Sequence, residues 1–116
     1  MEAMMRYAVP VSGGVMCPHF GHCEHFALID VDEVKKEIIK KELVTAPEHE
    51  PGLFPKWLAE KGVARVIAGG MGMRAQGLFR ESGIQVIVGA MESDPEKAVL
   101  NYVNGLLAIG DNICDH

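Results

Sequence analysis

Short apolar runs alternate along the chain with segments whose apolar residues repeat at helical spacing. Four runs predict strands, because they are rich in β-branched and aromatic residues and are followed by glycine or acidic turn residues. They are Arg6–Ser12, His25–Val31, Val63–Ala68 and Ile84–Val88. An irregular loop, Gly13–Glu24, separates the first two. The last two runs are almost continuously apolar, which is typical of parallel strands that are covered on both faces.

Three further segments are predicted to be helices. The first ends at Gly62, and the second, Met73–Ser82, is closed by Gly83. The third begins with a capping box, Ser93–Glu96, which has a proline in its first turn. Apolar faces are formed by Leu53, Phe54, Trp57 and Leu58 in the first helix, and by Ala98, Val99, Tyr102, Val103 and Leu106 in the third.

The charged segment Val34–Val44 fits two structures. Ile39 and Leu43 lie four residues apart, as on one face of a helix, but apolar and charged residues also alternate through the segment. A tight turn at Asp32 and Glu33 favours a hairpin partner for the preceding strand.

The resulting order is β-β-β-α-β-α-β-α. Two buried strands joined by a helix predict parallel neighbours with helices on both faces of the sheet, and the early hairpin adds an antiparallel strand. The expected fold is therefore a three-layer α/β/α sandwich on a five-stranded mixed sheet. We expect residues 1–116 to form one domain, since no linker or repeat divides the chain.

Composition and charge exclude several functions. The chain has 116 residues and a formal net charge of −5, and its basic residues form no stripe, so nucleic-acid binding is not expected. No apolar stretch is long enough to span a membrane, and the N-terminus does not resemble a signal peptide, so the cytoplasm is the expected compartment. Three cysteines, an odd number, argue against a disulfide framework.

The most reactive residues of the chain gather in two short segments. The loop Cys17–Cys23 contains two thiols together with the imidazoles of His19 and His22, and the C-terminus adds Cys114 and His116. Thiolates and imidazoles bind zinc, copper, iron and iron–sulfur clusters. Adjacent His22 and Cys23 would point apart in an extended backbone, so one ion would not take all four loop residues. Two or three of them, completed by the tail or by the sulfides of a cluster, form a simpler site.

The alternative is that both loop cysteines are small buried hydrophobic residues and that the histidines cap turns.

A glycine-rich turn, Gly69–Ala75, follows a predicted strand and opens a predicted helix. Gly70, Gly72 and Ala75 match a dinucleotide-binding fingerprint, which would suit a nucleotide-binding or anion-binding enzyme. The favoured interpretation is a tight turn whose backbone N–H groups bind an anion, either a phosphate or a negatively charged metal–sulfide cluster. Arg74 is a candidate counter-charge.

Two acids suggest a third chemistry. Asp30 and Asp32 share one face of the second predicted strand, and paired carboxylates can hold a metal for hydrolysis. No third acid is positioned with them by the sequence, and turn formation accounts better for Asp32.

Four stretches together resemble the dinitrogenase iron–molybdenum cofactor biosynthesis domain, the family of the nitrogenase accessory cofactor carriers. They are the loop CPHFGHCEHFALIDVD, the run HEPGLFPKWLAEKGVARVIAGGMGMRA, the later GIQVIVGA and the ending Cys-Asp-His. The resemblance covers nearly the whole chain, and its most specific parts are the histidine-cysteine loop and the glycine turn.

The resemblance implies a ribonuclease H-like fold in which Val34–Val44 is a strand. It also implies a non-enzymatic protein, a carrier or scaffold that transiently binds an iron–sulfur or molybdenum–iron–sulfur cluster, with cluster donor and acceptor proteins as partners. Metal ligands would come from Cys17, His19, His22 and Cys23, with Cys114 and His116 from the tail and with Gly70 and Gly72 shaping the facing turn. A monomer or weak homodimer is expected, and a mononuclear zinc or copper protein is the alternative.

Overall fold

Six strands and three helices make up the part of the chain that the computed structural model describes, residues 4–17, 23–47, 53–107 and 109–110. The strands are β1 (Met4–Ser12), β2 (Val15–Met16), β3 (His25–Asp32), β4 (Glu37–Thr45), β5 (Arg65–Ile67) and β6 (Gln85–Ile87). The helices are α1 (Leu53–Glu60), α2 (Met73–Glu81) and α3 (Pro95–Val103). None of the described helices is long and apolar enough to cross a membrane.

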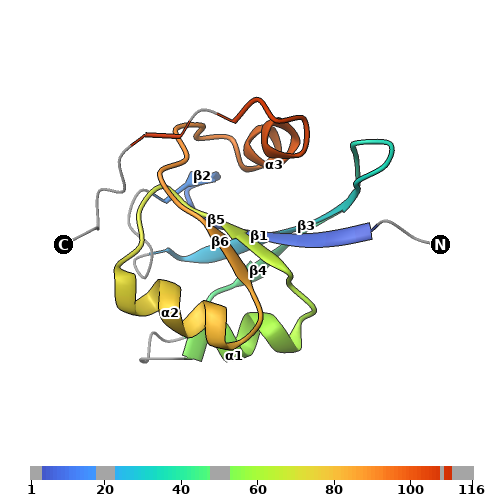
Figure 1. Cartoon of the computed structure of the whole chain (residues 1–116). Coiled ribbons are helices and arrows are strands. Elements are labelled where there is room, and N and C mark those ends of the chain that lie inside the picture. The colour runs from blue at the N-terminus through green and yellow to red at the C-terminus, as the bar shows by residue number, and fades with distance from the viewer. Residues whose placement is uncertain (1–3, 18–22, 48–52, 108, 111–116) are drawn as a thin grey trace.

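The strands form one mixed sheet in the order β4-β3-β1-β5-β6, and β2 pairs with the end of β1 (Figure 1). β3 runs antiparallel to both of its neighbours, whereas β5 and β6 run parallel to β1. The carboxyl ends of β1, β5 and β6 therefore lie at the same end of the sheet, which we call its carboxyl end. The predicted mixed α/β architecture is confirmed, and the assignment to the ribonuclease H-like class stays a prediction.

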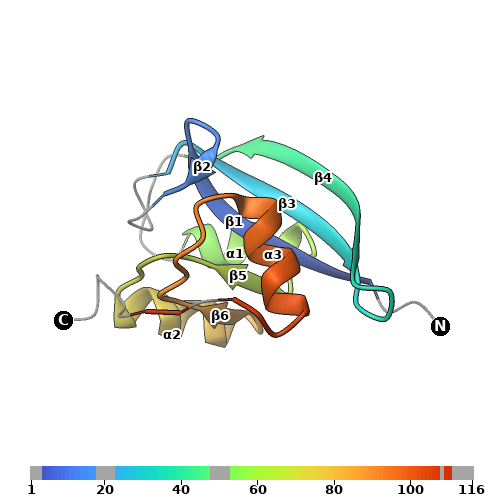
Figure 2. The same ribbon diagram turned by 90° about the horizontal axis from the view of Figure 1, so that it is seen from above.

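Helices lie on both faces of the sheet, with α1 and α2 on one face and α3 on the other (Figures 1 and 2). Side chains of a strand point alternately to its two faces. Accordingly, Tyr7 and Val9 of β1 pack in a core with Val99 of α3, whereas Ala8 packs in a second core with Leu58 of α1. β1 is thus buried on both sides.

The ambiguous segment Val34–Val44 is a strand for most of its length, because Glu37–Thr45 forms the edge strand β4. Its pairing with β3 shifts by one residue at Asp30 and Val31, so that Ile39 has no partner in the register. This bulge interrupts the alternation of apolar and polar residues, which explains why the sequence pattern also fitted a helix.

The sheet has six strands rather than the predicted five. Val15–Met16 was expected to lie in an irregular loop but forms the short antiparallel strand β2. Gly13 and Gly14 have φ angles of +62° and +85°, the conformation of a two-residue hairpin turn that glycine adopts without strain. β3 and β2 are therefore both antiparallel to β1, where one antiparallel strand was expected.

The predicted capping box at the start of α3 is wrong by one residue. Asp94, not Ser93, is the N-cap, and its Oδ1 accepts hydrogen bonds from the backbone N–H groups of Glu96 and Lys97 at 2.9 and 3.3 Å. At the other end the helix stops at Val103, and Leu106 is 73% exposed instead of continuing the apolar stripe. The aspartate provides the stronger acceptor next to Pro95, which occupies the first turn.

Candidate metal centre

Cys17 lies beside the end of β1, in the position that β5 leaves open. β5 pairs with β1 only at Tyr7 and Ala8. Further along the same side of β1, β2 pairs with Val11 and Ser12, and the backbone N–H of Cys17 donates to the carbonyl of Pro10 at 2.8 Å. The side chain of Cys17 is buried. The first predicted ligand is therefore held at the carboxyl end of the sheet.

Cys23 lies on the opposite side of β1. It directly precedes Glu24, whose backbone N–H donates to the carbonyl of Val11 at 3.2 Å as the chain enters β3. Cys23 is half-buried and packs against the core under α1 and α2. The two cysteines thus lie on either side of the last residues of β1.

The glycine turn (residues 69–72) connects β5 to α2 at the carboxyl end of the sheet. Gly72 is the N-cap of α2 and provides no side-chain hydrogen bond to the N–H groups of the first turn. Its φ of −64° and ψ of 155° are accessible to any residue, so backbone conformation does not by itself require glycine there. The Nε2 of Gln76 donates to the carbonyl of Met71 at 2.9 Å and holds the turn against the helix.

Gly89 connects this turn to the end of the described chain, although it belongs to none of the motifs recognised in the sequence. Its N–H donates to the carbonyl of Gly69 at 3.0 Å, and its own carbonyl accepts from the N–H of Gly110 at 2.7 Å. Gly89 has a φ of +79°, and a Cβ atom there would lie 2.3 Å from the carbonyl oxygen of Gly110. Its position directly after a predicted strand was the available signal.

The predicted ligands fall into two groups. Cys17, Cys23, Gly70, Gly72 and Arg74 are described, with Gly70 buried and Arg74 exposed in the first turn of α2. His19, His22, Cys114 and His116 lie outside the described residues. Within residues 4–17, 23–47, 53–107 and 109–110, no group of three or more His, Cys, Asp or Glu residues is suited to hold a metal ion.

The two acids considered for hydrolysis have structural partners. Asp30 is buried and accepts two hydrogen bonds from the Arg6 guanidinium, at 2.7 and 3.1 Å. This hydrogen bond raises the pKa of Arg6. The Oδ1 of Asp32 accepts from the backbone N–H groups of Val34 and Lys35 in the following turn. Both acids lie at the far end of β3 from the cysteines, so they do not form an open carboxylate pair.

Comparison with known proteins gives a consistent family. Residues 4–105 match the family model described as dinitrogenase iron-molybdenum cofactor. A curated relative, the uncharacterized protein MJ0580 of Methanocaldococcus jannaschii, is 30% identical over 86 residues, which is 72% of this chain and 73% of that protein. The crystal structure of PH0822 superposes with a TM-score of 0.82 at 27% identity, over 90% of this chain and 94% of the other. The orange protein of Desulfovibrio gigas, solved in its apo form, shares the fold with a TM-score of 0.72 at 24% identity, over 97% and 98% of the two chains.

Proposed function

The chain belongs to the dinitrogenase iron-molybdenum cofactor family, and on that basis we propose that it is a carrier or scaffold for an iron–sulfur or molybdenum–iron–sulfur cluster or its precursor. The family connects the chain with metallocluster biosynthesis, and the carrier role is our extension of it. The cluster is cargo in this proposal, so the protein performs no catalysis. Its partners are the proteins that donate and accept the cluster, and it works in the cytoplasm.

The observation that carries the proposal is that three segments lie at the same end of the sheet. Cys17 beside β1, the glycine turn after β5 and Gly89 after β6 all lie at the carboxyl ends of strands. In open α/β sheets, ligands usually bind at the carboxyl ends of the strands. Cys17 and the glycine turn, from the two motifs most specific to the resemblance, thus lie at the same end of the sheet.

The positions of the cysteines favour a cluster over a single ion. Cys17 and Glu24 bond to opposite sides of β1, and strands are about 4.8 Å apart, so the backbones of these two residues are separated by about two strand spacings. Cys23 directly precedes Glu24, on the far side of β1 from Cys17. A single zinc ion binds each thiolate at about 2.3 Å and requires the sulfurs to approach closely. A cluster with its own sulfides spans a wider gap between its protein ligands.

The tail can complete the site. Ile109 pairs with Ala90, and Gly110 bonds to Gly89, so residues 109–110 lie at the same carboxyl end of the sheet. Cys114 is four residues further on, a reach of at most about 14 Å. We therefore propose Cys114 and His116, together with His19 and His22 of the loop, as further ligands.

The glycine turn supplies the electrostatic part of the proposed site. The N–H groups at the start of α2 carry partial positive charge and receive no side-chain cap from Gly72. Such N–H groups stabilise an anion, and metal–sulfide clusters with thiolate ligands are anionic. Arg74, exposed in the same helical turn, adds a full positive charge.

Differences in exposure suit a protein that must release what it binds. Cys17 is 5% exposed, whereas Cys23 is half-buried and Arg74 is exposed. A structural zinc site is closed around its ion, but a carrier needs a side from which an acceptor can reach the cargo. Cys23 and Arg74 lie on that accessible side in our proposal.

Anaerobic reconstitution tests the proposal against the single-ion alternative. Metal-free protein is incubated with iron and sulfide, with molybdate added in a parallel sample, and separately with zinc or copper(I) alone; retained metal is measured after gel filtration. We expect stoichiometric retention of iron with sulfide and its loss in the Cys17→Ser, Cys23→Ser variant. His25→Gln is the matched control, because His25 lies two residues beyond Cys23 but is not a proposed ligand.

Two results would contradict the cluster assignment. One is stable retention of zinc or copper without sulfide, lost in the same double variant, which would establish a mononuclear site. The other is equal retention of iron by the wild type and the double variant. Trp57, the sole tryptophan, lies 5.6 Å from the Phe26 ring and reports whether each variant is folded.

A further inference from the structure

The two edges of the sheet differ in how they are protected against pairing with another strand. β4 carries Lys40, Lys41 and Glu42 and is distorted by the bulge at Ile39. Charged residues and bulges are the usual protection of an exposed edge. β6, at the opposite edge, consists of Gln85, Val86 and Ile87 and has no charged residue.

One residue of β6 presents its backbone outward. The N–H of Gln85 donates to Ala64, and the carbonyl of Ile87 accepts from Ala68, so both residues bond toward β5. Backbone groups of successive residues in a strand point to opposite sides. The N–H and C=O of Val86 therefore face away from β5, and in the part of the chain that the structure describes no strand pairs with them.

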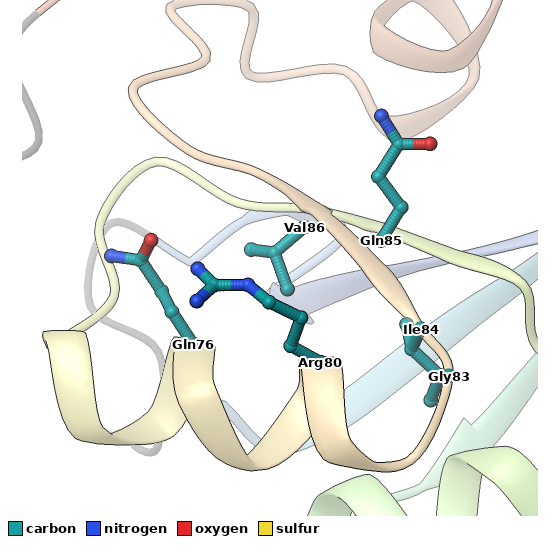
Figure 3. A pocket seen from close by; sticks show the side chains of 6 residues that line it. All are labelled: Gln76, Arg80, Gly83, Ile84, Gln85 and Val86. Carbon is teal, nitrogen blue, oxygen red and sulfur yellow. The ribbon is translucent and has the colours of Figure 1, made fainter.

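A cavity of about 310 Å³ lies along this edge, between α2 and β6. Figure 3 shows the side chains of Gln76 and Arg80 reaching from α2 toward Val86. Gly83, Ile84 and Gln85 complete the lining, which contains no carboxylate. Arg80 is exposed, and among the described residues it forms no ion pair. The groove thus offers one positive charge next to an unpaired strand.

We propose that the β6 edge binds an extended acidic segment of a partner protein, which adds a strand to the sheet. The backbone of that segment bonds to the N–H and C=O of Val86. Residues opposite each other on paired strands point to the same face, and Val86 packs on the face of α1 and α2. A carboxylate side chain opposite Val86 therefore projects into the groove and meets Arg80.

Charge argues against a second copy of this chain as the occupant. Pairing of β6 with β6 would bring two copies of Arg80 together. Pairing with β4 would meet an edge that its charged residues and its bulge at Ile39 already protect. The surface does not depend on bound metal, so the proposal stands independently of the cluster.

NMR titration of metal-free, isotope-labelled protein tests the proposal. The probes are two capped octapeptides of alternating threonine and valine, one with a central aspartate and the other with a central lysine. We expect the aspartate peptide to shift the amide signals of Arg80 and residues 84–88 saturably, and the lysine peptide to bind at least roughly fivefold more weakly.

Two substitutions separate the backbone contribution from the charge. Val86→Pro removes the outward N–H and leaves the bonds to β5, so it abolishes binding while the protein stays folded. Arg80→Glu reverses the preference between the two peptides. Lys56→Glu, on the exposed side of α1, is the matched control and leaves binding unchanged.

Four outcomes would overturn the proposal: no binding of the aspartate peptide, equal binding of both peptides, binding that survives Val86→Pro, or shifts centred on β4. The same shifts on adding inorganic phosphate alone would identify a simple anion site instead. Shifts that depend on protein concentration without peptide would identify self-association, which also contradicts the proposal.

Discussion

Asp30 illustrates how a single residue can be recognised in the sequence while its role is not. Its carboxylate is buried and pairs with both Nε and Nη2 of Arg6, whose Nη1 donates to the carbonyl of Lys61 after α1. The pair therefore ties β1, β3 and the end of α1 together. The sequence identified the acid, but its partner follows from the register that places Arg6 opposite Asp30. Hydrophobic periodicity predicts a strand without fixing its register.

Replacing Asp30 by Asn is expected to lower the free energy of unfolding by about 1–3 kcal/mol. The change removes the charge that the two hydrogen bonds from Arg6 depend on, and it leaves a partly buried guanidinium without its counter-ion. Urea unfolding measures the difference. Asp32→Asn is the control and should cost less than about 1 kcal/mol, because asparagine can still accept the turn hydrogen bonds. Equal losses in the two variants would argue against this role of the ion pair.

At the scale of elements, the strands and helices with strong periodicity were predicted within a few residues. β2 was missed, and β4 was predicted as a strand although its pattern also fitted a helix; both outcomes have local causes. β2 has only two residues and depends on the Gly13-Gly14 turn, while the bulge in β4 breaks the alternation that defines a strand.

The revised cap of α3 can be tested by a pair of alanine substitutions. Asp94→Ala removes the acceptor for two backbone N–H groups and is expected to cost about 1 kcal/mol of stability. Ser93→Ala should change stability by less than about 0.5 kcal/mol, because this exposed serine is not the cap. Thermal or urea unfolding of both variants decides the matter, and the reverse order would restore the capping box predicted from the sequence.

The contact between Gly89 and Gly110 is expected to be the most sensitive glycine position of the site. Gly89→Ala combines a positive φ with a Cβ 2.3 Å from a carbonyl oxygen, and should cost about 3 kcal/mol or more. Gly105→Ala is the matched control, because Gly105 has a φ of +74° but no atom within 4 Å of the added Cβ, and it should cost about 1 kcal/mol.

Unfolding experiments on both glycine variants measure the difference, and hydrogen exchange at Gly110 shows whether the chain end has been displaced. Equal costs would mean that the approach of Gly110 to Gly89 contributes nothing beyond backbone strain.

At the scale of the whole molecule, the buried side chain of Tyr7 is expected to make the free energy of unfolding decrease at alkaline pH. Tyr7 is fully buried, and burial raises its pKa despite the hydrogen bond from Arg65 at 2.7 Å. The unfolded chain then loses the tyrosine proton at lower pH than the folded protein does. The stability from neutral Tyr7 is therefore fully present below about pH 10 and lost as the pH rises through the folded pKa.

Comparison with Tyr7→Phe isolates this effect. At neutral pH the variant loses the hydrogen bond to Arg65, at a cost of about 1 kcal/mol. Above about pH 10 the wild type should lose stability more steeply than the variant, so the difference between their free energies of unfolding shrinks. Denaturant unfolding across this pH range measures it. A difference that stays constant to the highest pH would contradict the account.

The candidate site shows where sequence reasoning ends. The cysteine loop and the glycine turn are each recognisable as motifs, but they are about fifty residues apart in the sequence. Only the parallel pairing of β1, β5 and β6 places Cys17 and the glycine turn at the same end of the sheet. Gly89 was missed because its role depends on the approach of Gly110, a contact between segments that no local pattern encodes.

The central claim is that Cys17 and Cys23, on either side of β1, hold a metal–sulfur cluster in the cell. Its most direct test is the iron, molybdenum and acid-labile sulfide content of protein purified without oxygen and without reconstitution. The wild type and the Cys17→Ser, Cys23→Ser variant are purified side by side, and we predict metal together with labile sulfide in the first and neither in the second. Metal without sulfide, or the same metal and sulfide in both proteins, would contradict the claim.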